Sequence, residues 1–169
     1  INFLKQNRDS TFFLYLPYYS VHTPLMAKEN LKEKYRIKKG EDAEKNETYA
    51  AMVETVDTNI GLLLKSLDEL GLSKNTMVVF TSDNGGIRAV SRQEPLRAGK
   101  GSYYEGGIRV PYIVRWPGVV EAGAKNETPI VNMDFFPTFM EIAGVQLPKK
   151  VLDGMNLVPL LRGGELDSR

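Results

Sequence analysis

An apolar stretch that ends in a polar, glycine-containing run is the feature that most constrains the fold. Residues 77–80 (Met-Val-Val-Phe) have the composition of a buried β-strand, and residues 82–86 (Ser-Asp-Asn-Gly-Gly) follow almost at once. Open α/β sheets bind ligands at the carboxyl ends of their strands, and the oxygens of Asp83 and Asn84 suit a hard cation. The same residues are also ordinary turn formers, because Asn and Gly tolerate a positive φ. The run predicts a strand end that carries either a cation site or a plain turn.

A long amphipathic helix precedes this strand. Apolar residues recur at three- and four-residue spacing from Tyr49 to Leu70, which places them along one face of a helix. Asn46 or Thr48 is suited to cap its start, and Gly71 is suited to end it. The spacing therefore predicts a helix over this segment.

A second apolar run, residues 12–16, comes before the helix and reads as a strand buried on both faces. A helix between two such strands is typical of a βαβ crossover, so we expect this strand to lie parallel to the strand over residues 76–81. His22 follows the first strand. The topology therefore predicts that His22 lies at the same sheet edge as Asp83 and Asn84.

The remaining elements complete a predicted α/β fold with a mixed, mostly parallel sheet flanked by helices. Residues 112–116 form a third expected strand. Asp134 is interpreted as the N-cap of a helix over residues 135–143, and Gly144 is expected to end that helix.

Glycine and charge of both signs are dense between residues 97 and 111, a segment too polar for a core. Lys100 lies between two glycines that allow a ligand to approach closely, although a solvated loop lysine would have the same neighbours. Glu105 and Arg109 are expected to form a structural ion pair.

Basic and aromatic side chains surround this segment. Arg88, Arg92 and Arg97 either attract anionic sugars or belong to a plain basic loop. Tyr103 and Tyr104 either line the mouth of a pocket or pack against the fold.

Composition limits the classes of function. The 169 residues carry a net charge of +1, which gives no reason to expect a nucleic-acid partner or a membrane surface. There is no cysteine, so no disulfide can form, and no apolar run approaches the ~20 residues of a membrane span. Because the chain starts at Ile1 and enters a strand almost at once, we expect it to be a piece of a longer protein.

Taken together, these segments resemble the sulfatase family of the alkaline-phosphatase-like superfamily, most closely its arylsulfatase and glycosaminoglycan-sulfatase members. The resemblance extends from residue 12 to residue 161 and implies that residues 1–169 are a single, incomplete catalytic domain. The segments that carry it are His22-Thr23-Pro24, Ser82-Asp83-Asn84-Gly85-Gly86, Gly99-Lys100-Gly101, Glu105-Gly106-Gly107-Ile108-Arg109-Val110-Pro111, Arg115-Trp116-Pro117-Gly118, Asp134, Pro137-Thr138 and Ala143-Gly144.

The resemblance also implies roles for four residues. Asp83 and Asn84 would be metal ligands for calcium, whose preferred donors are carboxylate and carbonyl oxygens. Lys100 would contact the sulfate group of the substrate. His22 would contact the sulfate or the leaving oxygen, so both Lys100 and His22 are expected to be catalytic and substrate-binding.

One part of the family pattern is missing from this chain. Sulfatases use a formylglycine made from Cys or Ser in a Cys/Ser-x-Pro/Ala-x-Arg motif, and neither the motif nor the early Asp-Asp pair occurs here. We therefore expect an absent N-terminal half to complete the domain and to supply the formylglycine, and we expect this fragment alone to be inactive. A sulfated glycan or sulfated small molecule is the expected substrate, and the family setting implies an extracytoplasmic location.

Two other functions remain open. A phosphodiester or phosphonate hydrolase of the same superfamily is one alternative, although such enzymes often use extra histidines and this chain has one. A non-catalytic binding or structural fragment is the other, and the missing nucleophile favours it for the chain as it stands.

Overall fold

The computed structural model describes residues 1–38 and 46–166, which fall into two compact units. The first comprises Ile1–Ser73 and Asn84–Pro111, and the second comprises Lys74–Asp83 and Tyr112–Arg169. The predicted single partial domain over residues 1–169 therefore contains two separately packed parts. That residues 1–169 form one partial catalytic domain stays a prediction.

The first unit contains the predicted long helix. Helix α3 (Glu47–Glu69) begins where Asn46 Oδ1 accepts a hydrogen bond from the Tyr49 backbone N–H at 2.9 Å. It ends before Gly71, whose φ of +73° lies in the left-handed region that glycine adopts without steric cost. The prediction of this helix and of both its ends is confirmed.

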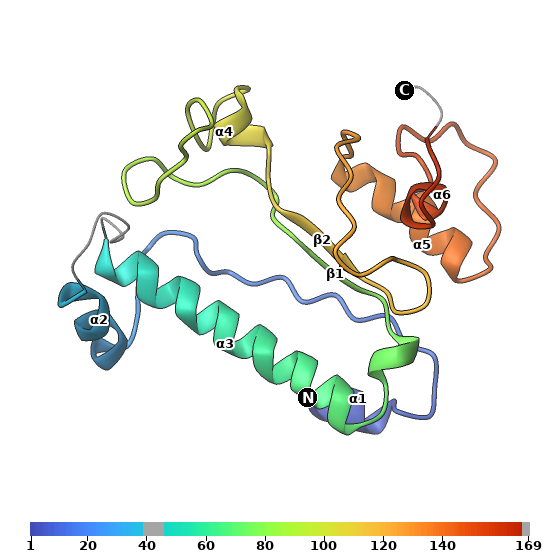
Figure 1. The fold of residues 1–169 in the computed structure, drawn as a ribbon, viewed down its shortest axis with the longest axis horizontal. Coiled ribbons are helices and arrows are strands. Elements are labelled where there is room, and N and C mark those ends of the chain that lie inside the picture. Colours follow the sequence, from blue (N-terminus) through green and yellow to red (C-terminus); the bar gives the residue numbers. More distant parts are fainter. Residues whose placement is uncertain (39–45, 167–169) are drawn as a thin grey trace. The chain divides into compact units, whose positions relative to one another are not determined.

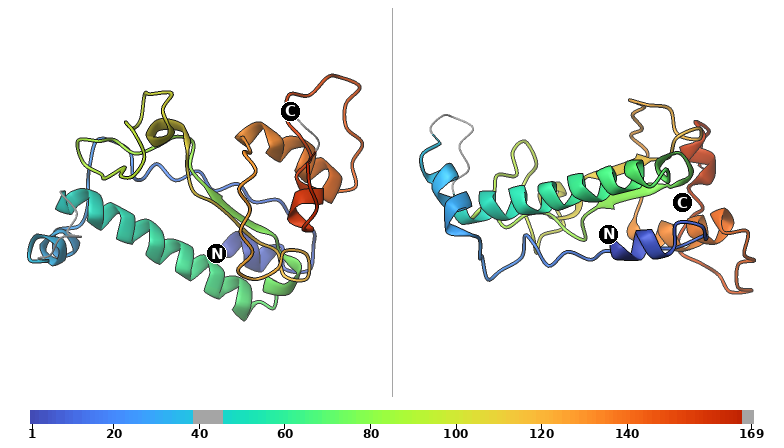
Figure 2. Two further views of the ribbon diagram at one scale, coloured as in Figure 1. Left: turned by 45° about the horizontal axis from the view of Figure 1, so that its top comes forward. Right: turned by 90° about the horizontal axis from the view of Figure 1, so that it is seen from below.

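Two short helices accompany α3 in the same unit, α1 (Asn2–Gln6) and α2 (Glu29–Arg36). Figures 1 and 2 show α2 packed beside the first turns of α3. An ion pair of 2.8 Å joins Lys34 on α2 to Glu54 on α3. The charged segment that begins at Lys28 therefore contains a helix, and its residues 39–45 lie outside the described part of the chain.

The second unit contains a two-stranded antiparallel sheet. Strand β1 (Val78–Thr81) pairs with β2 (Tyr112–Arg115), with Val79 opposite Val114. A 3₁₀ turn, η1 (Ser73–Asn75), precedes β1. Both strands lie within predicted strand segments, but their antiparallel pairing does not provide the mostly parallel arrangement expected from the sequence.

The predicted buried strand over residues 12–16 is wrong for this chain. The segment has no sheet partner among the described residues, and Phe13 and Tyr15 are 69% and 74% exposed. Apolar composition favours a strand only where a neighbouring strand pairs with its backbone, and no strand of the described residues pairs with this segment. The parallel crossover to residues 76–81 is therefore absent as well.

The helices of the second unit are η2 (Asn132–Asp134), α5 (Phe135–Ile142) and α6 (Val158–Leu161). Asp134 does not cap α5 as predicted. Its backbone, with φ −69° and ψ −18°, is already helical, whereas an N-cap residue adopts an extended conformation.

Asp134 instead connects two segments of this unit. Its fully buried carboxylate accepts hydrogen bonds of 2.8 Å from the backbone N–H groups of Val131 and Met155. Thr138, also buried, donates to the Asp134 carbonyl at 2.6 Å and accepts from the Leu157 N–H at 2.8 Å. These bonds hold the chain before α6 against α5.

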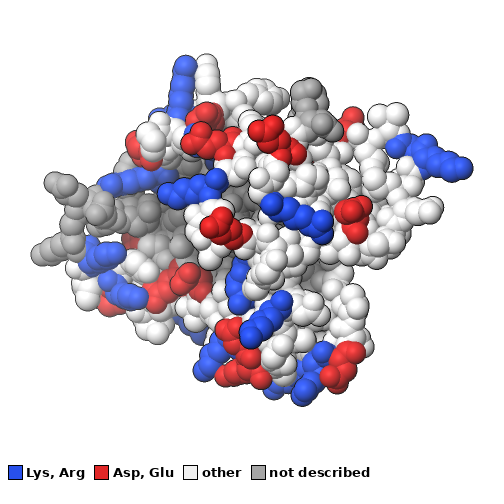
Figure 3. Space-filling model, turned by 45° about the vertical axis from the view of Figure 1, so that its right-hand side comes forward, with Lys and Arg blue, Asp and Glu red and all other residues white. Residues whose placement is uncertain are grey.

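Charged side chains of both signs are interspersed on the face shown in Figure 3. No described helix is both long enough and apolar enough to cross a membrane.

Candidate functional site

The glycine-packed loop of the first unit, residues 85–110, folds back on itself through main-chain hydrogen bonds. The Gly85 N–H donates to the Gly107 carbonyl at 2.8 Å, and the Lys100 N–H donates to the Gly86 carbonyl at 2.9 Å. The Gly106 N–H donates to the Arg97 carbonyl at 2.8 Å. Three stretches of the loop, around residues 85, 98 and 106, therefore lie against one another, with the short helix α4 (Glu105–Ile108) in the last of them.

These stretches approach so closely that side chains have no room. A Cβ atom added at Gly107 would lie 2.1 Å from the Ser102 carbonyl oxygen, and one added at Gly85 would lie 1.9 Å from the Gly106 carbonyl oxygen. Real Cβ atoms do not come this close to backbone atoms, so only glycine permits this packing. The glycine density of the sequence is thus explained by close backbone approach.

Lys100 lies in the middle of this packed loop. Ala98, two residues before it, has a φ of +65°, a conformation that costs a residue with a Cβ roughly 1 kcal/mol. Gly101, directly after it, has a φ of +85°. The surrounding hydrogen bonds hold this unusual backbone, and the exposed Lys100 side chain extends from it.

Asn84 directly precedes the glycine pair to which the Lys100 main chain is hydrogen-bonded. Its Nδ2 donates to the Gly85 carbonyl at 3.2 Å, which orients the half-buried amide. Because Lys100 is bonded to Gly86, its main chain lies beside the residues that directly follow Asn84.

Asp83 is the last residue before the boundary between the two units, and its carboxylate is exposed. Asp83 and Asn84 together offer a carboxylate and an amide oxygen, which are hard donors of the kind calcium binds. Calcium takes six to eight oxygens, and the described residues contain no group of three or more acidic, histidine or cysteine side chains that could hold a metal ion. The donor set fits calcium in chemical type, but two donors would make up only part of the coordination sphere of that ion.

His22 occupies a turn of the first unit in a defined orientation. Its Nδ1 lies 2.8 Å from the Thr23 carbonyl oxygen, which can only accept, so Nδ1 carries the proton. In the neutral ring the lone pair is then on Nε2. Within the described part of the chain, His22 makes no hydrogen bond to Asn84 or Lys100, and the parallel sheet that was expected to bring them together is absent.

Tyr19 is a residue of this turn that sequence reasoning missed. Its hydroxyl donates to the same Thr23 carbonyl, and its ring centroid lies 5.5 Å from that of His22. The His22 backbone N–H donates to the Tyr19 carbonyl at 3.0 Å. The available signal was its position three residues before the single histidine of the chain.

Two further expectations for the loop are resolved. Glu105, the first residue of α4, and Arg109, the residue directly after its end, form the predicted ion pair at 3.2 Å. Tyr103 and Tyr104 are 97% and 50% exposed, so Tyr103 does not pack against the described fold. The Arg97 guanidinium lies 3.8 Å from the centroid of the Tyr104 ring, a cation–π contact that the sequence did not reveal.

Comparison with known proteins identifies the family. The sulfatase family model matches residues 1–145. A sulfatase of Formosa agariphila is 40% identical over 171 residues, covering 94% of this chain and 31% of the relative. Steryl-sulfatase of Rattus norvegicus is 41% identical, covering 96% of this chain and 28% of the relative. The chain therefore belongs to the sulfatase family, whose members are sulfuric ester hydrolases.

A solved structure supports the same assignment. The chain superimposes on Ps i-CgsB, solved in complex with k-i-k-neocarrahexaose, with a TM-score of 0.85 and 40% identity, covering 94% of this chain and 35% of that one. The predicted α/β, alkaline-phosphatase-like fold class is thereby confirmed. The chain spans about a third of the length of these proteins.

Proposed function

We propose that this chain is part of the catalytic domain of a calcium-dependent sulfatase that hydrolyses a sulfate ester. The observation that supports this most strongly is the glycine-packed loop, which fixes the backbone of Lys100 beside the residues that follow Asn84. A loop built this tightly around an exposed lysine suits a group that must meet a bound anion in a fixed geometry.

Asp83 and Asn84 are the proposed calcium ligands in this chain. Calcium, when bound, would place positive charge against the sulfate oxygens. Because these two residues provide only part of a coordination sphere, the remaining donors are proposed to come from an N-terminal half of the same domain. That half is also proposed to provide the formylglycine nucleophile.

Lys100 and His22 are the proposed catalytic and substrate-binding residues. Hydrolysis breaks the bond between sulfur and the bridging oxygen, and negative charge develops on that oxygen as the bond opens. The Lys100 ammonium stabilises charge on the sulfate group. His22, in its protonated form, has an N–H at Nε2 that can donate to the leaving oxygen, while its Nδ1–H stays bonded to the Thr23 carbonyl.

A sulfated sugar is the proposed substrate class, with an aryl sulfate as the simpler alternative. The complex of Ps i-CgsB with a neocarrahexaose supports the sugar, since that protein shares 40% identity with this chain. Residues 1–169 are proposed to form part of one domain together with the N-terminal half. An extracytoplasmic location is proposed from the family setting.

The metal assignment is tested with the full-length protein. We expect Asp83→Ala to lower both calcium affinity in titration calorimetry and turnover of 4-nitrophenyl sulfate on the order of 100-fold. Asp153→Ala, which removes an exposed carboxylate elsewhere in the second unit, is the matched control and should change neither quantity. Affinity and turnover like those of the wild type in Asp83→Ala would refute the assignment.

A further inference from the structure

The glycine-packed loop carries more positive charge than the chain as a whole. Residues 85–110 contain five Lys or Arg and two Asp or Glu, a formal charge of +3, whereas the complete sequence has a net charge of +1. A local excess of this size raises the concentration of anionic ligands near the loop. The charges of this loop therefore need an explanation beyond general solubility.

Among the described residues, most of these cations have no acidic partner. Arg109 pairs with Glu105 at 3.2 Å. Arg88, Arg92 and Arg97 are exposed and form no ion pair with any residue in the described ranges 1–38 and 46–166. Elsewhere in the first unit arginines do find acids, as Arg36 does with Glu29 at 3.0 Å. The arginines before α4 are thus available to an external anion.

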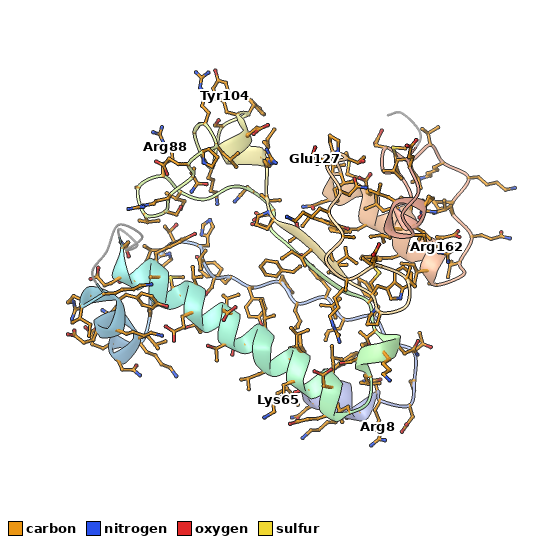
Figure 4. All side chains as sticks on the ribbon, in the orientation of Figure 1. Arg8, Lys65, Arg88, Tyr104, Glu127 and Arg162 are labelled. Carbon is orange, nitrogen blue, oxygen red and sulfur yellow. The ribbon has the colours of Figure 1, made fainter. Side chains whose placement is uncertain are left out.

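Two of the three arginines are held in place by the loop itself. Arg97 lies over the face of Tyr104 at 3.8 Å, which restricts its guanidinium to the plane above the ring. The side-chain stem of Arg88 packs on Gly99, because a Cβ added at Gly99 would lie 2.7 Å from Arg88 Cγ. Arg88 therefore packs directly on the residue that precedes Lys100. Figure 4 shows Arg88 and Tyr104 on the part of the loop near α4.

The chemistry of this arrangement selects a particular ligand. A guanidinium binds sulfate or carboxylate oxygens through two parallel hydrogen bonds, and it does so best when its orientation is already fixed. Tyr103, which directly precedes Tyr104 in the sequence, is 97% exposed and offers a flat, largely apolar ring face to solvent. Anionic groups attached to a ring of a saccharide match both features.

We propose that Arg88 and Arg97 bind an anionic group of the substrate other than the sulfate that is hydrolysed. The substrate is then a glycan with several negative charges, rather than a singly charged aryl or steroid sulfate. This inference rests on the proposed sulfatase function, because it assigns Lys100 to the reacting sulfate. The bound group is a sulfate or carboxylate borne by a sugar.

Binding to defined hexasaccharides tests the proposal independently of turnover. Titration calorimetry with the full-length protein would use a heparin-derived hexasaccharide, a hyaluronan hexasaccharide that carries only carboxylates, and neutral maltohexaose. We expect the heparin hexasaccharide to bind about tenfold more weakly to Arg88→Ala and to Arg97→Ala than to the wild type. Arg162→Ala, which removes an exposed and unpaired arginine of the described second unit, should bind like the wild type.

The three sugars separate the sources of charge. An equal loss with hyaluronan would identify the group as a carboxylate, and a loss confined to heparin would identify it as a sulfate; either result supports the proposal. Affinities of both variants within twofold of the wild type would overturn it. So would binding of maltohexaose as tight as that of heparin, no binding of heparin at all, or an equal loss in Arg162→Ala.

A kinetic comparison keeps this proposal separate from the function on which it rests. With the wild type active on 4-nitrophenyl sulfate, the loss of kcat/KM in Arg97→Ala should be at least about tenfold larger on a multiply sulfated oligosaccharide than on the aryl sulfate. Equal losses on both substrates would count against a second anionic contact. Absence of any sulfatase activity in the wild type would instead refute the proposed function, while the calorimetric result would still report on Arg88 and Arg97.

Discussion

Replacing Gly107 with alanine tests whether close backbone packing positions Lys100. The new Cβ would lie 2.1 Å from the Ser102 carbonyl oxygen and 2.6 Å from the Gly99 carbonyl oxygen. Both neighbours are backbone atoms, so no side chain can rotate away to make room. The loop must shift, and the Gly85 N–H bond to the Gly107 carbonyl at 2.8 Å must stretch or break.

The expected cost follows from these two effects. Forcing an extra carbon into a filled space typically costs about 1–3 kcal/mol, and a lost backbone hydrogen bond adds about 1 kcal/mol. Gly107 lies in α4, where alanine recovers up to about 1 kcal/mol through its higher helix propensity. The net expectation for Gly107→Ala is a destabilisation of about 1–3 kcal/mol.

Gly61→Ala is the matched control. Gly61 lies within α3, and a Cβ added there has nothing within 4 Å. Alanine should therefore stabilise the protein by about 0.5–1 kcal/mol through helix propensity alone. The same chemical change thus has opposite signs at the two positions.

Urea unfolding of the two variants, followed by far-ultraviolet circular dichroism, measures this difference. Activity adds a second readout, because a displacement of about 1 Å at Lys100 should lower kcat/KM on the order of 100-fold in Gly107→Ala. Gly61→Ala should keep wild-type activity. If both variants were equally stable and equally active, the argument from loop packing would be wrong.

Two further predictions concern the second unit. Burial and the nearby charge of Asp134 raise the pKa of Tyr112 from 10.0 to about 12, so the folded state favours the neutral phenol. The unfolded chain loses this proton at lower pH than the folded state does. The folded state therefore loses about 1–2 kcal/mol of stability between pH 10 and 12, after allowance for the partial exposure of Tyr112. Tyr112→Phe should remove that loss. It should also stabilise the protein by about 1 kcal/mol at pH 7, because the Tyr112 hydroxyl is buried without a partner among the described residues. If the free energy of unfolding of the variant fell between pH 10 and 12 as it does in the wild type, this prediction would be refuted. Asp134→Asn should cost about 2–3 kcal/mol, since the new amide NH₂ must face the N–H of either Val131 or Met155; thermal unfolding at pH 7 matching the wild type would contradict the network.

Local sequence patterns predicted the elements that depend on neighbouring residues. The α3 helix follows from apolar spacing, the Asn46 cap and Gly71, all of which act within one or two turns. The Glu105–Arg109 pair likewise depends only on one helical turn. Such features could be predicted because their partners are fixed by the chain itself.

Features that depend on distant partners were predicted less well. The apolar run 12–16 matches a buried strand, but no described strand pairs with it. Asp134 precedes an apolar helix as an N-cap would, yet its carboxylate bonds Met155, 21 residues away. Whether residues 12–16 pair with a strand, and whether Asp134 bonds Met155, depends on distant parts of the chain, which local spacing does not describe.

The candidate site shows the same division. Glycine density pointed to the loop around Lys100, although the contacts between Gly85 and Gly106 and between Gly107 and Ser102 required the structure. The cation–π contact of Arg97 with Tyr104 joins residues seven apart in a loop without regular spacing. Residue types therefore predicted a candidate site, and the structure shows how the loop around Lys100 is held.

Sulfate-ester hydrolysis by the full-length protein is the most direct test of the central claim. The rates on 4-nitrophenyl sulfate and on a phosphonate monoester should be compared for the wild type, for Lys100→Ala and for Lys125→Ala, an exposed lysine of the second unit. We predict that the wild type prefers the sulfate, that Lys100→Ala loses most of this activity, and that Lys125→Ala retains it. Preference for the phosphonate, or full activity in Lys100→Ala, would contradict the account.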